Sequence, residues 1–265
     1  MAFTRRRYWR SASLRRPTSS ALLAGSSICR SNEGPVGPLQ RREGHRVPDL
    51  YDTIYRRRDV RREFTGAPLP TGALERMLAA AHAAPSVGLS QPWDFVIVTN
   101  PDTRHTFWEH VQVERARFMA DLDERRSAAF AQIKIDGVLE STLSIVVTYD
   151  AQRGAPHVLG RHAINDAGLY SVCLAIENLW LAATAEALGV GWVSFCREEF
   201  IAELLRLPDG IRPVAWLCLG PVAELARIPD LEAANWRSRK PLADVVHYGT
   251  WGERSAPQDL GGTAT

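Results

Sequence analysis

Four segments in the second half of the chain constrain the fold most. The longest, residues 169–188, carries only two charged side chains, so it predicts a helix that is buried almost all round. Residues 143–148 and 213–219 are largely apolar runs, which are typical of buried strands. Residues 189–194 follow the long helix directly and predict a strand that begins with glycine. Helices and strands therefore alternate, and the expected fold class is α+β, with a central mixed β-sheet and helices on both faces.

The first half of the folded region predicts further helices. Asp49 can cap a helix over residues 49–58, and Thr71 can cap the next helix, which has one apolar face. Residues 102–132 predict a single long charged helix, and residues 198–205 predict a short one. A hairpin-like order of the strands stays open at this point.

The two ends of the chain differ in composition from the rest. The first 46 residues hold ten arginines against two acidic residues and are rich in Ser, Gly and Pro. Such a start resembles an organelle transit peptide, but a disordered tail or an upstream start codon chosen in error explains it equally well. We expect residues 1–47 to be a disordered extension, residues 48–254 to form one domain and residues 255–265 to be a flexible tail.

Composition excludes several classes of protein. Without its first 46 residues the chain has more acidic than basic side chains, which argues against a nucleic-acid or membrane partner. The four cysteines are scattered without a C-x-x-C pair, so neither a disulfide framework nor a metal site is expected. Cys173 and Cys218 lie in apolar runs and are expected to be buried thiols. We expect a soluble, cytoplasmic protein.

A charged stretch is the first candidate site. Its arginines lie close together, and guanidinium groups bind phosphate oxygens through paired hydrogen bonds. An aspartate stands among them although its charge weakens the attraction for a phosphate, so it needs another reason to be there. The stretch consists of Arg57, Arg58, Asp59, Val60 and Arg61. The alternative is that Asp59 pairs with its arginine neighbours on a solvated helix face.

A loop over residues 84–92, just before a short predicted strand at 94–98, is the second candidate. Two prolines stiffen it, and Gly88 permits close approach of a ligand to the backbone. Its hydroxyl and amide groups, next to a tryptophan, suit a flat ring system with polar edges. The candidate contacts are Pro85, Ser86, Val87, Gly88, Gln91 and Trp93. An ordinary connecting loop is the alternative.

Two further segments complete the candidates. Gly191, Val193 and Ser194 belong to the glycine-led strand, whose end can place Ser194 in a cleft, although a tight helix-to-strand turn also explains the glycines. A late basic cluster contains Arg237 and Arg239, which can complete a phosphate site or belong to a solvated charge run. The sequence has no G-x-S-x-G elbow, no P-loop and no G-x-G-x-x-G after a strand, which argues against a serine hydrolase and a classical nucleotide-binding fold.

Together these segments resemble the nitroreductase-like flavoprotein family. That family has an Arg-Arg-Ser-x-Arg sequence that binds the FMN phosphate, a Pro-Ser loop, a buried Asn-Leu-x-Leu-Ala-Ala helix, a Gly-Trp strand and a late basic pair. The counterparts in this chain are residues 57–61, 85–86, 178–183, 191–192 and the pair 237 and 239. The resemblance runs from about residue 49 to residue 254.

Within the family, the chain is similar to a branch whose members make 5,6-dimethylbenzimidazole, the lower ligand of vitamin B12. That branch has Asp in place of Ser in the arginine motif, as at Asp59. It also has Val-Gly-Trp-Val-Ser and Val-Ala-Trp-Leu-Cys-Leu-Gly, which stand here at 190–194 and 214–220. The chain departs from the pattern at Gly168, where the branch tends to have an acidic residue.

The resemblance implies an intertwined homodimer with FMN bound across the subunit interface. Reduced FMN is then a substrate: with O2 as co-substrate it is cleaved to 5,6-dimethylbenzimidazole and erythrose 4-phosphate. Asp59 and Ser194 match the positions expected to act in catalysis. The electrons would come from NAD(P)H or from a separate flavin reductase. The alternative function is that of an FMN-dependent NAD(P)H nitroreductase or flavin reductase.

Overall fold

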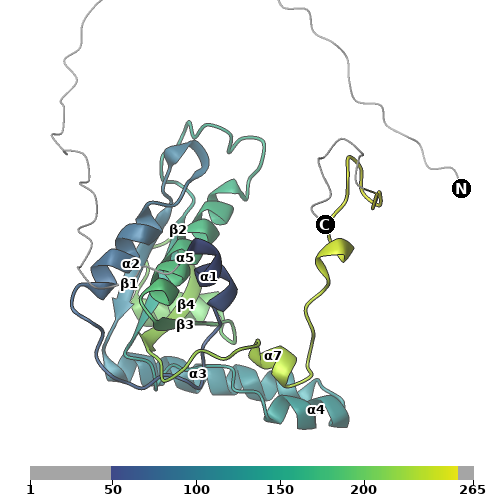
Figure 1. Cartoon of the computed structure of the whole chain (residues 1–265). Coiled ribbons are helices and arrows are strands. Elements are labelled where there is room, and N and C mark those ends of the chain that lie inside the picture. Colours follow the sequence, from purple (N-terminus) through teal and green to yellow (C-terminus); the bar gives the residue numbers. More distant parts are fainter. Residues whose placement is uncertain (1–48, 256–265) are drawn as a thin grey trace, which may run out of the picture. The chain divides into compact units, whose positions relative to one another are not determined.

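A four-stranded sheet forms the centre of the protein. The computed structural model describes residues 49–255, so the expected extension and nearly all of the expected tail lie outside the described residues. The strands are β1 (Trp93–Val98), β2 (Leu143–Asp150), β3 (Leu188–Val193) and β4 (Ile211–Pro221), in the spatial order β1-β2-β4-β3 (Figure 1). Neighbouring strands pair antiparallel. We expected a sheet with both parallel and antiparallel pairs. Among the described residues, the one parallel pairing is the isolated bridge between Asp59 and Val190.

The helices confirm the α+β class. Those of the described residues are α1 (Leu50–Arg56), α2 (Ala73–His82), α3 (Pro101–Ala120), α4 (Glu124–Ala131), α5 (Ala167–Ala185), α6 (Glu198–Leu205) and α7 (Asp230–Ala233). Short 3-10 turns, η1 (Val87–Leu89) and η2 (Leu242–Asp244), are added to them.

Helices cover both faces of the sheet, as predicted (Figure 1). Buried side chains alternate along β4, because successive residues of a strand point to opposite faces. Ala215, Leu217 and Leu219 belong to the cluster that contains α2 and α5. Trp216 and Cys218 belong to the cluster that contains α3, α4 and α6.

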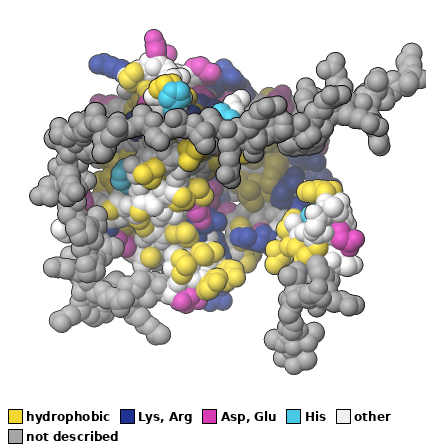
Figure 2. Space-filling model, turned by 90° about the horizontal axis from the view of Figure 1, so that it is seen from above, with side chains coloured by type: hydrophobic (Ala, Val, Ile, Leu, Met, Phe, Trp, Pro, Cys, Tyr) yellow, Lys and Arg dark blue, Asp and Glu magenta, His cyan; other side chains and the backbone are white. Residues whose placement is uncertain are grey.

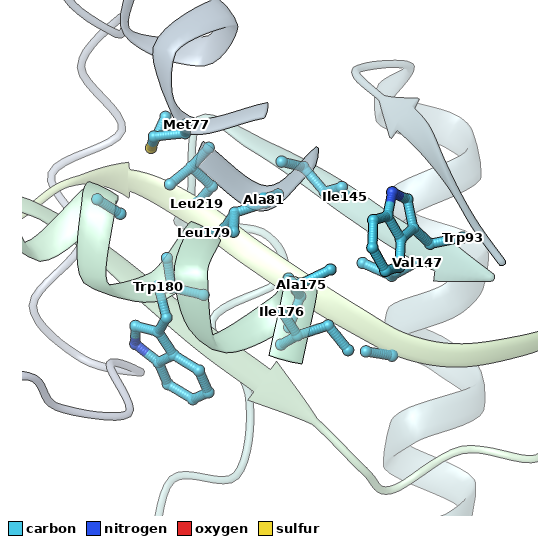
Figure 3. Close-up of a cluster of buried hydrophobic side chains, with 14 of the residues drawn as sticks. Met77, Ala81, Trp93, Ile145, Val147, Ala175, Ile176, Leu179, Trp180 and Leu219 are labelled. Carbon is cyan, nitrogen blue, oxygen red and sulfur yellow. The ribbon is translucent and has the colours of Figure 1, made fainter. Parts of the chain in front are cut away.

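The cluster between α2, α5 and the sheet is the larger of the two. Figure 3 shows Met77 and Ala81 of α2 together with Leu179 of α5 and Leu219 of β4. All four side chains are fully buried. Removal of this apolar surface from water is what holds α5 against the sheet.

Helix α5 has one exposed side, so the prediction of burial almost all round is wrong. Tyr170, Cys173, Leu174 and Glu177 form an exposed row, which we call the α5 stripe, because positions three and four apart share one side of a helix. The expected burial of Cys173 is wrong for the same reason, whereas Cys218 is buried as predicted. Among the described helices, α5 is long and apolar enough to cross a membrane, a test that the core helix of a soluble protein also passes, and half of its most apolar window is buried.

The expected helix over residues 102–132 is two helices. Asn100 caps α3, since its side chain accepts a hydrogen bond from Thr103 N at 2.9 Å. Asp123 caps α4 in the same way, accepting from Arg126 N at 2.8 Å. A cap residue has non-helical backbone angles, so the chain turns between Ala120 and α4.

The first two helices form where predicted, with differences at their surfaces and caps. Asp49 caps α1 by accepting a hydrogen bond from Tyr51 N. The N-cap position of α2 is Gly72, in a left-handed conformation, and not Thr71. Helix α1 exposes four large apolar side chains: Leu50, Tyr51, Ile54 and Tyr55. Figure 2 shows that apolar side chains lie open among charged ones on the face it draws.

Candidate active site

The arginine-rich stretch leaves α1 and runs beside strand β3. Val60 N donates a hydrogen bond to Val190 O at 2.9 Å, and Trp192 N donates to Asp59 Oδ1 at 3.0 Å. The two segments approach so closely that a Cβ atom at Gly191 would lie 2.0 Å from Val60 O. The pairing therefore requires glycine at position 191.

A cavity of about 430 Å³ lies next to this pairing. Two of the predicted segments meet there, since Ser194 at the end of β3 lines the same space as the arginine-rich stretch. The predicted residues that line the cavity are Arg58, Asp59, Val60, Arg61 and Ser194. Val193 is not among them, because its side chain is buried in the core. The cavity is thus the candidate active site.

Asp59 is fixed by two contacts and still faces the cavity. Oδ1 accepts the hydrogen bond from Trp192 N, and Oδ2 lies 2.6 Å from Arg61 Nη2. Both are contacts that a carboxylate makes as an acceptor. The side chain keeps 39% of its surface exposed, so it can meet a bound molecule. Asp59 lies beyond α1 and pairs with β3, so it does not belong to a solvated helix face.

Positive charge accumulates beside this carboxylate. The guanidinium of Arg58 donates to backbone carbonyls only, and its buried Nε has no partner among the described residues. Burial, followed by the nearby charges of Arg239 and Arg57, lowers the pKa of Arg58. A bound anion relieves repulsion of this kind, so the cluster fits a phosphate group.

Contacts with α5 hold the arginine-rich stretch in place. Arg57 Nε lies 3.3 Å from Glu177 Oε1, and its guanidinium lies 4.9 Å from the centroid of the Trp180 ring. Trp180 Nε1 donates a hydrogen bond to Arg58 O at 3.0 Å. The stretch is therefore anchored near the C-terminal half of α5.

The proline-rich loop lies at the opposite end of α5. Its backbone is fixed there because Val87 N donates to Ser171 Oγ at 3.0 Å. Residues 171 and 180 are nine positions apart on one helix, which corresponds to about 14 Å of rise. Within one chain, the loop is therefore separated from the arginine-rich stretch by much of the length of α5.

Two residues of this loop are packed against the chain itself. A Cβ atom at Gly88 would lie 2.7 Å from Leu159 N, so the close approach that this glycine permits is to the backbone of the same chain. Trp93 is only 3% exposed and donates from Nε1 to His82 Nδ1 at 3.2 Å. The Trp93 ring is thus a core residue within the single chain.

Part of the loop is exposed at the surface, although Ser90 and Pro92 are buried. Ser86 Oγ accepts a hydrogen bond from Gln91 N at 3.0 Å, which closes the loop on itself. Pro85 is exposed, and Leu89 next to Gly88 is 80% exposed. This surface is accessible to a second molecule.

The late arginines separate into two environments. Both Arg237 and Arg239 are exposed. Arg239 is close enough to Arg58 for its charge to lower the pKa of that side chain. Arg237 lines a different hollow, together with Arg125 and Arg126 around the start of α4. Arg239 therefore joins the positive cluster, whereas Arg237 does not.

Aromatic side chains line the cavity as well, and none of them is among the predicted site residues. They come from α3, from α4 and from the segments after β3 and α7: Phe118, Phe130, Phe195 and Trp236. The ring centroids of Phe118 and Phe130 are 4.9 Å apart. Their apolar spacing was visible in the sequence, but the same spacing is typical of a helix that packs on any core.

Gly168 has a packing role. It lies in the first turn of α5, where a Cβ atom would be 2.6 Å from Tyr149 Oη. The ring of Tyr149, on β2, thus occupies the space that an acidic side chain at position 168 would need. Glycine at position 168, where the family branch tends to have an acidic residue, is therefore explained by the packing of the Tyr149 ring against it.

Comparison with known proteins confirms the resemblance. The profile of the nitroreductase family matches residues 54–221. The chain is 39% identical to the 5,6-dimethylbenzimidazole synthase of Rhodospirillum rubrum over 194 residues, which cover 73% of this chain and 92% of that protein. It is 32% identical to the 5,6-dimethylbenzimidazole synthase of Rhodobacter capsulatus, with 72% and 92% covered. Its fold is similar to that of oxidized iodotyrosine deiodinase bound to FMN and 3-iodo-L-tyrosine, with a TM-score of 0.61, 22% identity, and 77% of this chain and 100% of that chain covered. The chain therefore belongs to the nitroreductase family.

Proposed function

We propose that this protein is a 5,6-dimethylbenzimidazole synthase, which converts reduced FMN and O2 to 5,6-dimethylbenzimidazole and erythrose 4-phosphate. The observation that carries the proposal is the cavity that Asp59, Arg58 and Ser194 line together. Reduced FMN is the substrate, and O2 is the co-substrate. The identity to a synthase over nearly the whole length of that protein supports the proposal.

The positive cluster suits the phosphate of FMN. Arg58 lines the cavity and has no carboxylate partner within residues 49–255, and Arg57 and Arg239 add charge close by. Arg61 is different, because it already pairs with Asp59. We assign Arg58 and Arg239 to the phosphate and Arg61 to the positioning of Asp59. Arg57 pairs with Glu177 and does not line the cavity, so it contributes to phosphate binding only through its charge.

Asp59 and Ser194 face the same cavity and have complementary hydrogen-bonding abilities. Reduced FMN supplies the electrons for O2 and the carbon and nitrogen atoms of both products, and the remaining pyrimidine part of its ring system leaves as a further fragment. In our proposal Asp59 takes protons from the substrate and returns them, a role that typically contributes about 10²- to 10⁴-fold to a rate. Ser194 donates a hydrogen bond that orients the substrate. The aromatic side chains exclude water from the cavity, which prevents reactive oxygen species from being released before they react with the substrate.

Arg58→Gln should weaken FMN binding by roughly 10- to 150-fold, because a hydrogen bond to a charged group contributes about 1.5–3 kcal/mol. Quenching of FMN fluorescence measures the Kd. Arg56→Gln is the matched control: Arg56 is exposed in the last turn of α1, and its loss removes the same charge. Equal losses of affinity in both variants would contradict a direct contact between Arg58 and the phosphate.

We also propose a homodimer in which each chain supplies its loop to the site of its partner. The exposed apolar side chains of the α5 stripe and of α1 support it, and α1 adjoins α5 through the pair of Arg57 with Glu177. If two α5 helices pair in opposite directions across their stripes, the Ser171 end of one lies against the Trp180 end of the other. The loop at the first end then reaches the positive cluster of the partner, and the two-fold axis makes two equal sites.

Leu174→Glu should convert the dimer to monomers and stop product formation. Leu174 is 47% exposed at the centre of the α5 stripe, and each unpaired carboxylate buried in the interface would cost about 3–5 kcal/mol. Sedimentation velocity measures the change. Val113→Glu is the control, because Val113 is 48% exposed on α3, which packs on the other face of the sheet. A Leu174→Glu protein that stays dimeric and active would rule out this interface.

The electron source and the compartment complete the proposal. We place the reaction in the cytoplasm, where NAD(P)H or a separate flavin reductase reduces FMN. The alternative is an FMN-dependent NAD(P)H nitroreductase or flavin reductase, which would share the fold. Asp59 favours the synthase, because the wider family motif has Ser at that position. Rapid NAD(P)H oxidation with FMN left unchanged would favour the reductase.

A further inference from the structure

We propose that Asp230 is a second proton-transferring residue of the cavity, which delivers protons to the substrate while Asp59 receives them. This inference rests on the proposed synthase function and deepens it. Asp230 is the first residue of the short helix α7 and lines the same cavity as Asp59 and Ser194. It reaches the site from a part of the chain far from both.

The carboxyl groups of the cavity differ in their contacts. Asp59 accepts a backbone N–H and pairs with Arg61. Glu63 Oε2 accepts hydrogen bonds from Arg61 N at 3.3 Å and Arg62 N at 3.0 Å. Within residues 49–255, the side chain of Asp230 neither caps its helix nor forms an ion pair or hydrogen bond. Of the three carboxyl groups, Asp230 is therefore the one that is held by no arginine or backbone N–H among the described residues, whereas Asp59 is held by such contacts and still faces the cavity.

The surroundings of Asp230 favour its neutral form. The charged groups around it are Arg58, Asp59, Arg61, Arg62, Glu63 and Lys134. Burial raises the pKa of Asp230 most, Glu63 raises it further and Asp59 adds a smaller effect, while Arg61 and Arg62 oppose them. Lys134 is already paired with Glu140. Asp230 thus keeps its proton to a higher pH than an ordinary aspartic acid.

The chemistry requires a proton donor as well as an acceptor. Cleavage of the flavin removes protons at some atoms and adds them at others, and two acids whose environments differ divide these roles. In the transfer, the O–H bond of Asp230 breaks, the proton moves to a nitrogen or oxygen atom of the substrate, and Asp230 becomes a carboxylate. No electrons are exchanged in this step. Asp230 regains its proton from solvent, since the residue is only partly buried.

Asp230→Asn in the full chain tests the proposal. The rate of dimethylbenzimidazole formation in a single turnover should fall by about 10²-fold or more, with the Kd for FMN changed less than about threefold. Wild-type activity should decline as pH rises through the pKa of Asp230, because the donor must be protonated, and the variant should lose this decline. Asp230→Glu should recover part of the rate. Glu232→Gln, on the same helix but not lining the cavity, should behave as wild type.

A readout without substrate keeps the test independent of turnover. Infrared titration of the substrate-free protein should show a carboxylic-acid band that loses its proton at a higher pH than an ordinary aspartic acid does, and Asp230→Asn should remove it. A band that is absent, or a variant with the wild-type rate and pH profile, would overturn the role of Asp230 and leave the synthase proposal standing. A wild-type protein that forms no dimethylbenzimidazole would overturn both.

Discussion

Asp59→Asn should lose nearly all dimethylbenzimidazole formation while it still binds FMN. Asparagine keeps an oxygen that can accept the hydrogen bond from Trp192 N, so the stretch beside β3 stays in place. It cannot take up a proton, and the rate should therefore fall by about 10²- to 10⁴-fold. Removal of a negative charge beside Arg58 should leave FMN affinity unchanged or increase it. Binding is measured by fluorescence and product by mass spectrometry.

Asp94→Asn is a matched control for this variant. Asp94 also pairs with an arginine, Arg153, at 2.7 Å, but it lies on β1 and does not line the cavity. Its loss should leave the rate unchanged, because exposed ion pairs contribute only about 0–1 kcal/mol to stability. Product formation at the wild-type rate by Asp59→Asn would exclude a proton-transfer role for Asp59.

Gly191→Ala should damage both the fold and the site. The added Cβ atom would stand 2.0 Å from Val60 O, so the stretch beside β3 must move away. Overpacking of this kind costs about 1–3 kcal/mol, and the displacement also breaks the hydrogen bonds from Val60 N and to Asp59 Oδ1. We expect a Tm lower by about 2–12 °C for a domain of this size, together with loss of FMN binding.

Gly210→Ala is the control for Gly191→Ala. It adds the same methyl group without a clash, so the difference between the two variants measures the effect of the clash with Val60 O on stability and FMN binding. A Cβ atom at Gly210 meets nothing within 4 Å, and its cost is limited to the positive φ of +85°, about 1–2 kcal/mol. A calorimetric scan and an FMN titration compare the two variants. If Gly191→Ala has the same Tm as Gly210→Ala and binds FMN with wild-type affinity, the close pairing of Val60 with β3 is not needed for the site.

Local signals in the sequence predicted most of the fold. The bounds of α6 agree with the prediction residue for residue, and both apolar runs form the strands β2 and β4. The exposed side of α5 was not predictable from its composition, because an apolar face has the same pattern whether it packs on the core or on another chain. The break between α3 and α4 was missed because the periodic pattern concealed the cap at Asp123.

The candidate site was predictable in part. Asp59 and Ser194 were singled out, and both line one cavity. The role of Gly191 depends on contact with Val60, which is far away in the sequence, so spacing alone suggested only a turn. Within one chain, the loop and the arginine-rich stretch contact opposite ends of α5, an arrangement that no local motif in the sequence indicates. Asp230 had no local motif that marked it.

The product formed from reduced FMN is the most direct test of the proposed function. FMN is reduced chemically without oxygen, mixed with the wild-type protein and exposed to air, and the products are identified by mass spectrometry. We predict 5,6-dimethylbenzimidazole and erythrose 4-phosphate in amounts that match the FMN lost, and no benzimidazole from Asp59→Asn. Complete recovery of the flavin as FMN, with hydrogen peroxide as the only other product, would contradict the proposal.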